Sequence, residues 1–198
     1  VHQIPTDKLG PSSFDGNGKV QEQVLSKKKK KKLETLSKEK SVSLFSALYA
    51  CLNEYLCQLS GQRSFTIGTP VLNRNNKLEQ GTVGYFANTA VLNSQKQKSG
   101  ESKAEYLLRC SDNVSDMLGH QSTSFREIVN AVGGTRVSGA NPLFQVMLVL
   151  QSEAEQISED KRDIIFERVD STESAVKYDL TFTFAKVNGE LHLATEYA

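Results

Sequence analysis

The stretch Arg136–Gln151, RVSGANPLFQVMLVLQ, joins a turn of small residues to the most strand-like run in the chain. Pro142 fixes its own φ at about −65°, and side chains such as those of Ser138 and Asn141 bond the backbone of turns. The residues that follow, 143–150, are almost all apolar, which is typical of a strand inside a core. The stretch therefore predicts a buried strand whose start is held by a turn.

Side-chain alternation divides the residues of this strand between two faces. Phe144, Val146 and Leu148 fall on one face, and Gln145 and Met147 fall on the other. We interpret the motif mainly as architecture that holds the strand in register, with a smaller share in shaping a cleft beside it.

Hydrophobic periodicity along the rest of the chain changes between strand and helix patterns. Asn188-Gly189 is the strongest short hairpin signal, and Gly61 is a natural residue to end a helix. Strands are predicted at 19–25, 65–68, 89–92 and 162–170 and in a hairpin over 177–198, and helices at about 27–40, 41–61, 102–121 and 124–132. This order predicts an α/β fold, a two-layer sandwich with a mixed, largely antiparallel sheet and helices on one face.

The charged residues are balanced overall but uneven along the chain. There are 24 Lys and Arg against 23 Asp and Glu, a formal net charge of +1, which gives no general attraction to nucleic acid or to a membrane surface. Most of the local excess is the run Lys27–Lys32, at the start of a predicted helix, where positive charge opposes the macrodipole. Two interpretations stay open: a solvated helix face, or a surface for an acidic partner protein.

Several functional classes find no support in the sequence. No apolar run reaches the roughly 18 residues of a membrane span, and no signal-peptide core occurs, so a cytoplasmic protein is expected. Cys51, Cys57 and Cys110 have no disulfide or metal-ligand spacing and are expected to be small buried thiols. The sequence has no phosphate-binding glycine motif, nucleophile elbow or Cys/His cluster. A self-contained active site is therefore not expected.

Several segments, taken together and in order, resemble one known family. VGYFANTAVL (83–92) resembles I/V-G-x-F-V-N-T, HQSTSFRE (120–127) resembles H-Q-D-x-P-F-E, and RVSGANPLFQV (136–146) resembles R-x-x-S-x-N-P-L-F-Q-V with a small shift in spacing. Weaker matches are IPTDKLGPSSFDG to an inter-lobe linker, IGTPVLNR to G-T-P-x-x-x-R, and KYDLTFTF to F-D-L-x-L. These motifs resemble those of the C-terminal lobe of nonribosomal peptide synthetase condensation domains, in the chloramphenicol-acetyltransferase-like superfamily.

The resemblance implies a division of the chain into residues 1–18, an inter-lobe linker, and residues 19–198, the C-terminal lobe. The family's H-H-x-x-x-D-G motif belongs to the N-terminal lobe and has no match in this sequence. The N-terminal lobe and the final helix of the C-terminal lobe are therefore expected to be absent, and the chain alone is expected to be inactive. The second motif departs from the family at Ser124 and Arg126, which stand in place of Pro and Glu.

The chemistry implied by the resemblance is amide formation between an acyl or peptidyl thioester and an aminoacyl thioester. Both substrates ride on phosphopantetheine arms of the upstream and downstream peptidyl carrier proteins, so no cofactor or metal is expected to bind this chain directly. A histidine of the N-terminal lobe would manage the proton or position the amine. The C-terminal lobe would form one wall of the substrate tunnel. The implied partners are the N-terminal lobe and the two carrier proteins, with no nucleic acid and no membrane.

No catalytic residue is expected in this chain, but the resemblance implies five residues that support the site. Arg74 resembles an arginine that in the family pairs with the aspartate of H-H-x-x-x-D-G, and the alternative is a loop arginine in water. Asn88 and Thr89 come where a strand begins near the expected tunnel, and Asn88 has the alternative of satisfying irregular backbone. Arg136 and Asn141, in the opening motif, complete the set.

Two functional alternatives stay open beside amide formation. One is an ester-forming relative, because the choice of nucleophile depends on the whole tunnel. The other is a non-catalytic module that docks carrier proteins or tailoring enzymes, a role for which Lys27–Lys32 would suit acidic carriers. The segment GYFANT favours condensation over the patterns of epimerisation and heterocyclisation domains. His120 is expected to be a structural histidine at a helix end rather than a lone catalyst.

Overall fold

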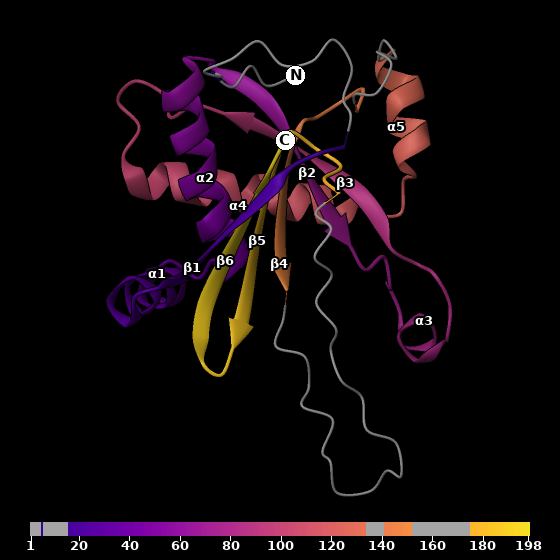
Figure 1. The fold of residues 1–198 in the computed structure, drawn as a ribbon, viewed down its shortest axis with the longest axis horizontal. Coiled ribbons are helices and arrows are strands. Elements are labelled where there is room, and N and C mark those ends of the chain that lie inside the picture. Colours follow the sequence, from indigo (N-terminus) through magenta and orange to yellow (C-terminus); the bar gives the residue numbers. More distant parts are fainter. Residues whose placement is uncertain (1–4, 6–15, 134–140, 152–174) are drawn as a thin grey trace, which may run out of the picture.

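The computed structural model of the chain describes residues 5, 16–133, 141–151 and 175–198 (Figure 1). Within these ranges six strands form a single sheet in the order β1-β6-β5-β4-β2-β3. The strands are β1 Lys19–Leu25, β2 Ser64–Val71, β3 Asn88–Gln95, β4 Val146–Gln151, β5 Leu180–Val187 and β6 Glu190–Tyr197.

The sheet is mixed, as the sequence predicts. β1 with β6, β5 with β6, and β2 with β3 are antiparallel, whereas β4 runs parallel to both β2 and β5. β4, the strand of the Arg136–Gln151 stretch, therefore lies in the middle of the sheet. The strand predicted at 162–170 and most of the linker predicted at 1–18 lie outside the described residues.

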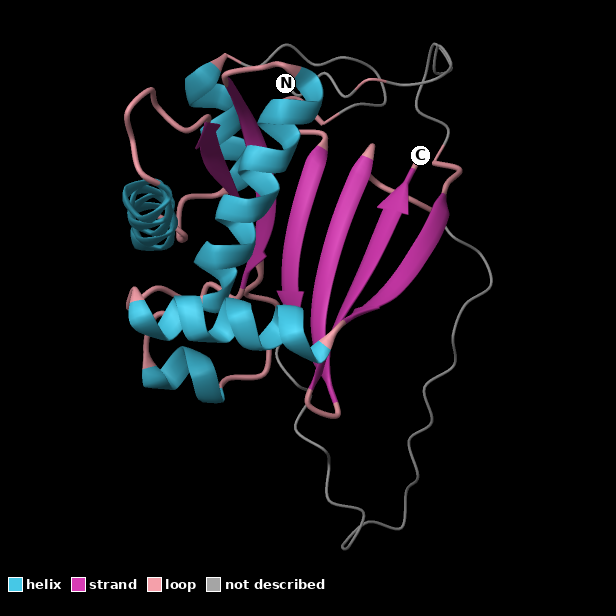
Figure 2. Cartoon of the chain, turned by 90° about the vertical axis from the view of Figure 1, so that its left-hand side faces the viewer, coloured by secondary structure: helices cyan, strands magenta, loops and turns pink. Residues whose placement is uncertain are grey.

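Helices gather on one face of the sheet, and its other face carries no helix from the described ranges (Figure 2). The helices are α1 Lys27–Glu39, α2 Leu44–Ser60, α3 Lys77–Gly81, α4 Lys103–Gly119 and α5 Phe125–Val132. α2 packs against α4, and both contact β3. This confirms the predicted α/β class, with helices against one face of a mixed sheet.

Local sequence signals explain where the helices begin and end. Ser43 caps α2 by accepting a hydrogen bond from the Ser46 backbone N–H, and the helix ends at Gly61, whose φ of 69° is left-handed. α4 and α5 each begin with a capping box, in which a serine and a glutamate three residues later bond each other's backbone N–H. In α5 the serine is Ser124, which stands where the family's motif has proline. Ser124 therefore caps the helix in place of that proline.

The core is the layer between the sheet and the helices. Apolar side chains on alternate positions of the strands meet the inner faces of α2 and α4, which is the arrangement that the two periodicities predict. Its fully buried members include Leu56, Ile67, Leu92, Val146, Leu148 and Leu191.

The predicted hairpin is confirmed at its turn as well as in its strands. Asn188 and Gly189 have φ values of 49° and 75°, and positive φ at both central residues defines the type I′ turn that Asn-Gly favours. The first residue of β4, in contrast, is Val146 rather than the predicted Leu143, because the turn at Asn141 extends through Phe144.

Three details of the sequence-based predictions are corrected by the structure. Cys51 is exposed, whereas Cys57 and Cys110 are buried as expected. Leu118, which helical spacing places on the same apolar stripe as Tyr106 and Leu107, has 44% of its surface exposed. The polar segment after β2, for which the sequence predicts a loop, contains the short helix α3, which Asn76 caps.

Neither membrane-spanning helices nor metal-ligand groups are found in the described ranges. No helix there is long and apolar enough to cross a bilayer. The same ranges hold no group of three or more His, Cys, Asp or Glu side chains placed to bind a metal ion.

Candidate functional site

The predicted site residues Asn88 and Thr89 lie at one end of the β2–β3 pair, and Arg74 lies in the loop that leaves this end. β2 ends at Val71, which pairs with Asn88, the first residue of β3. Between the two strands the chain makes an excursion, residues 72–87, that contains α3 and projects from the body of the molecule (Figure 1).

The Arg74 side chain forms hydrogen bonds with several backbone carbonyls of this excursion. Its Nη1 donates to the carbonyl oxygens of Glu79 and Thr82, the latter at 2.8 Å, and its Nη2 donates to the carbonyl of Gly84 at 3.1 Å. The guanidinium carbon also lies 4.3 Å from the centre of the Phe86 ring, a cation–π contact. Three of the N–H groups of Arg74 therefore bond carbonyls of the loop in which it lies, and its pairing with an aspartate of another lobe stays a prediction.

The side-chain amide of Asn88 bonds backbone groups, which is the alternative to substrate contact that the sequence analysis leaves open. Its Nδ2 donates to the carbonyls of Gln121 at 2.9 Å and Thr123 at 2.7 Å, and its Oδ1 accepts from the Thr89 N–H at 2.9 Å. These bonds tie the start of β3 to the loop between α4 and α5. Thr89 itself is half-buried and pairs with Pro70 across the strands.

Asn141 holds the turn that precedes β4. Its Oδ1 accepts from the N–H groups of Leu143 at 3.0 Å and Phe144 at 3.2 Å, and its carbonyl accepts from the Gln145 side chain at 2.9 Å. At Asn141 these bonds are the kind that the interpretation of the motif as architecture predicts. Arg136 and Ser138 lie outside the described residues, so their part in the motif remains a prediction.

The turn places Phe144 in a buried position beside β2. The ring packs edge-on to Phe125 of α5, with centroids 5.8 Å apart, and against Tyr178 at 5.2 Å. A Cβ atom added to Gly68 would lie 2.3 Å from this ring, so Gly68 leaves the space that Phe144 fills. The family-like segments of β2, the α4–α5 loop and β4 thus converge on one packed unit.

His120 lies at a helix end, where the sequence analysis expects a structural histidine. It is the residue that ends α4, and its Nδ1 lies 2.8 Å from the carbonyl oxygen of Asp116.

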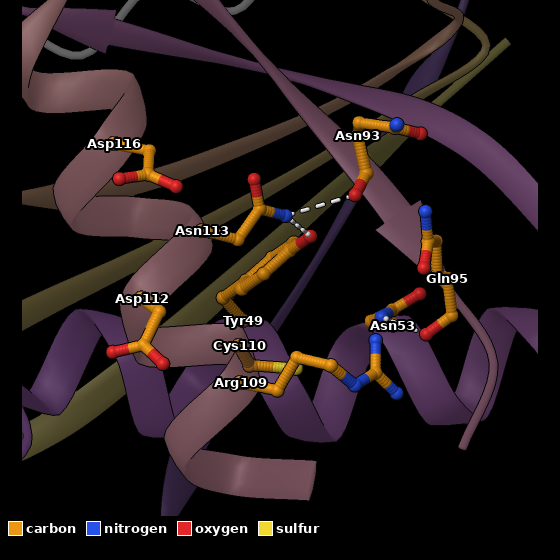
Figure 3. A pocket seen from close by; sticks show the side chains of 9 residues that line it. All are labelled: Tyr49, Asn53, Asn93, Gln95, Arg109, Cys110, Asp112, Asn113 and Asp116. Carbon is orange, nitrogen blue, oxygen red and sulfur yellow. Dashed lines mark hydrogen bonds between the residues drawn. The ribbon is translucent and has the colours of Figure 1, made fainter. Parts of the chain in front are cut away.

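A polar pocket lies where α2 and α4 meet β3 (Figure 3). It has a volume of about 220 Å³. Its lining is mostly amide and charged side chains: Tyr49, Asn53, Asn93, Gln95, Arg109, Cys110, Asp112, Asn113 and Asp116.

Several polar side chains of this pocket form hydrogen bonds with the edge strand of the sheet. Asn113 donates to the Tyr49 hydroxyl and to the carbonyl of Asn93, both at 2.8 Å, and Asn53 donates to the carbonyl of Gln95 at 3.0 Å. β3 is an edge strand, and helix side chains here occupy carbonyls that another strand would otherwise bond. Burial raises the pKa of the Tyr49 phenol well above its ordinary value of 10.0, so the phenol stays protonated as a structural group.

An ion pair at the start of α4 closes one end of the pocket. Arg109 bonds both carboxylate oxygens of Glu101, at 2.7 Å and 2.8 Å, and donates to the carbonyl of Lys96. The hydrogen bond from Arg109 lowers the pKa of Glu101 from 4.5 to about 2. Hydrogen bonds of Tyr49, Asn53, Arg109 and Asn113 thus give this pocket a structural role, and the sequence carries no motif that would have predicted it.

Comparison with known proteins identifies the family. The profile that matches is described as the condensation domain, and the match extends over residues 1–198. The chain belongs to the condensation-domain family. Among characterised proteins, one of the linear gramicidin synthase polypeptides of Brevibacillus parabrevis is 34% identical over 98% of this chain.

Solved structures show the same fold as this chain. The condensation domain from the monacolin K polyketide synthase MokA matches with a TM-score of 0.81 at 18% identity over 98% of this chain, and the X-domain from teicoplanin biosynthesis matches with 0.85 at 16% identity over all of it. A further structure of that X-domain is its complex with OxyB. The chain spans 4% of the gramicidin synthase polypeptide and 45% of each of the two solved chains.

Proposed function

We propose that this chain is the C-terminal lobe of a condensation domain that forms an amide bond between two carrier-bound thioesters in nonribosomal peptide synthesis. The observation that carries the proposal is the condensation-domain match over the whole chain, in which the family's C-terminal motifs occur in order. The similarity to a linear gramicidin synthase polypeptide supports the same role.

In this proposal the chain contributes no acid, base or nucleophile. The side chains of Arg74, Asn88 and Asn141 form hydrogen bonds with backbone groups. Each would therefore act by fixing the position of the chain around it. A histidine of the other lobe would move the proton, since the family's histidine motif has no match here. This lobe would then hold the two phosphopantetheine arms in line and limit the access of water to the thioester.

The direct test uses the complete condensation domain of the parent synthetase with two carrier proteins. One carrier is loaded with an acyl or peptidyl thioester and the other with an aminoacyl thioester, and intact-protein mass spectrometry follows the mass of the acceptor carrier. Transfer of the acyl group to the acceptor amine is expected. A complete domain that binds both carriers but never extends the acceptor would contradict the proposal.

A second candidate function is a non-catalytic docking module. Two observations favour it: the TM-score of 0.85 to the teicoplanin X-domain, whose complex with OxyB has been solved, and the exposed lysines of α1. Intact histidines in the other lobe together with acyl transfer would exclude this candidate. An ester-forming domain is distinguished in the same assay by a hydroxyacyl acceptor.

The lysine run offers a separate test of carrier docking. Replacing Lys28, Lys31 and Lys32 by glutamate should weaken the binding of an acidic carrier protein, with the largest effect at low salt. Isothermal titration at two ionic strengths measures the change. An affinity that is unaffected would leave the run as a solvated helix face.

A further inference from the structure

The two edges of the sheet differ in whether their backbone groups are covered. β3 forms one edge, and the side chains of Asn53 and Asn113 bond its carbonyls at Gln95 and Asn93. β1 forms the other edge, and no side chain from another described element bonds its backbone. An edge with free N–H and C=O groups is a template for a further strand.

The β5–β6 hairpin fixes which backbone groups of β1 face away from the sheet. Its two-residue turn is closed by a hydrogen-bonded pair, Val187 with Glu190, and such pairs alternate along antiparallel strands. Every second residue of β6 from Leu191 onward therefore points its N–H and C=O groups to β1, where the pairing begins at Leu25. The residues of β1 whose backbone groups point outward are Val20, Glu22 and Val24.

A side-chain contact agrees with this outward direction. The Gln21 Nε2 donates to the Glu22 carbonyl at 3.2 Å, at an exposed position. In the part of the chain that the structure describes, no other hydrogen bond reaches the outward groups of Val20, Glu22 and Val24. Most of the outward N–H and C=O groups of this edge are thus free to pair with another strand.

The side chains at the open edge place a negative charge between two apolar residues. Val20, Glu22 and Val24 lie on one face of the sheet, and the two valines are 45% and 52% exposed. Glu196 of β6 is paired with Val20, so it lies on the same face and diagonal to Glu22. Neither carboxylate forms an ion pair with another described residue. A basic side chain on an incoming strand would therefore meet two carboxylates.

A second copy of the chain fits this edge less well than an unlike strand. Two β1 strands that overlap fully about a two-fold axis place Glu22 opposite its own counterpart, because Glu22 is the middle residue of the strand. Like charges directly opposite each other destabilise a strand pair. The valines suit either occupant, so the charge of Glu22 favours a basic partner strand.

We propose that β1 is a docking edge for an extended segment of a partner protein that carries a basic residue between two apolar residues at alternate positions. The segment adds a strand beside β1, and its backbone pairs with the outward groups of Val20, Glu22 and Val24. Its basic side chain lies opposite Glu22 and its apolar side chains cover the valines. In this mode of recognition the backbone bonds supply affinity and the alternate side chains supply specificity.

The test compares the binding of two short peptides to the complete parent domain. The probe is acetyl-Thr-Val-Thr-Lys-Thr-Val-Thr-amide, and its matched control has glutamate in place of lysine; both carry the same fluorophore. Fluorescence anisotropy is expected to show binding of the lysine peptide about fivefold tighter or more, because one cross-strand charge pair is attractive and the other repulsive.

Amide hydrogen exchange locates the bound peptide. Exchange over 19–25 should slow when the lysine peptide binds, whereas exchange over 88–95 should not change, since the carbonyls at the β3 edge already have partners. Binding without slower exchange over 19–25 would refute the docking edge, and so would the absence of binding.

Two variants test the part played by Glu22. Glu22→Lys should reverse the preference between the peptides, because the charge at the edge changes sign while the backbone groups stay. Glu39→Lys makes the same change of charge on α1 and should keep the wild-type preference. Equal binding of the two peptides by the wild-type domain would remove Glu22 as the selecting residue.

Two further measurements separate this proposal from its alternatives. Self-association of the wild-type domain that slows exchange over 19–25 would assign the edge to a second copy and overturn the proposal. Amide formation is scored in the carrier assay, so a domain that forms amides without binding the peptide refutes only the docking edge, and one that binds without forming amides refutes only the proposed function.

Discussion

Gly68 shows how closely single residues fit around the candidate site. Its missing side chain is the space that Phe144 occupies, and an added Cβ atom would lie 2.3 Å from the ring. Because β2 and the Asn141 turn are both fixed by hydrogen bonds, neither moves aside freely. The Gly-Thr-Pro segment thus has a packing reason for its glycine as well as a family resemblance.

Gly68→Ala should therefore destabilise the protein by about 1–3 kcal/mol, the usual cost of overpacking a filled core. Urea unfolding followed by circular dichroism measures the change. Gly119→Ala is the matched control, since nothing lies within 4 Å of its added Cβ atom. Equal stabilities for the two variants would mean that Phe144 has room to move.

Asn88 links two segments through a single amide. Asn88→Ala removes three hydrogen bonds and should destabilise the protein by about 1–3 kcal/mol, with increased hydrogen exchange at the α4–α5 loop. Asn88→Asp keeps the acceptor for Thr89 but turns a carboxylate toward two carbonyls, so it should be no more stable than Asn88→Ala. Wild-type stability in either variant would contradict the structural role assigned to this residue.

At the scale of elements, α1 forms although six lysines occupy its N-terminal turns. Ser26 caps the helix, Lys30 forms an ion pair with Glu34 at 3.4 Å and also donates to the Gly189 carbonyl at 2.6 Å, and Leu33 packs against the core. Packing and capping thus outweigh the unfavourable interaction between the lysines and the helix dipole.

That balance predicts opposite effects at the two ends of α1. Lys27→Glu with Lys28→Glu should stabilise the protein by about 1 kcal/mol, because negative charge at the first turn favours the dipole. Lys38→Glu in the last turn should destabilise it by up to about 1 kcal/mol by the same interaction. Thermal unfolding at low salt measures the change in melting temperature of each variant relative to the wild-type protein. Changes of the same sign in the two variants would show that the helix dipole is not the cause.

The start of α4 carries a pH-dependent contact. The folded-state pKa of Glu101 is about 2, below its ordinary 4.5, so the ion pair with Arg109 contributes stability above about pH 4.5 and loses it as the pH falls toward 2. Glu101→Gln should make the free energy of unfolding less dependent on pH between 4.5 and 2 and leave its pH dependence near neutrality unchanged. Urea unfolding at a series of pH values measures this. The same loss of stability below pH 4.5 in both proteins would assign the acid sensitivity to other carboxylates.

At the scale of the whole molecule, signals that act over a few residues predicted the structure better than features that depend on distant pairing. The helix end at Gly61 and the turn at Asn188-Gly189 follow from such local rules, and the structure confirms both. β2 and β3 are longer than predicted because pairing with each other extends both strands, and pairing between distant segments is not visible in local periodicity.

The contacts of the candidate site residues could not be predicted from the sequence. The resemblance selected Arg74 and Asn88, yet the three carbonyls that surround Arg74 depend on the left-handed Asn73, with φ of 51°, and on the short helix α3. The polar network between α2, α4 and β3 was missed altogether, because its members are ordinary helix and strand residues that only tertiary packing brings together.

The central claim is that this chain supplies one wall of a catalytic cleft and another lobe supplies the proton-handling histidine. The most direct measurement is single-turnover acyl transfer between two loaded carrier proteins, carried out with residues 1–198 alone and with the complete parent domain, with the acceptor carrier analysed by mass spectrometry. The account predicts an extended acceptor with the complete domain and none above the uncatalysed background with residues 1–198. Comparable single-turnover rates for the two proteins would contradict it.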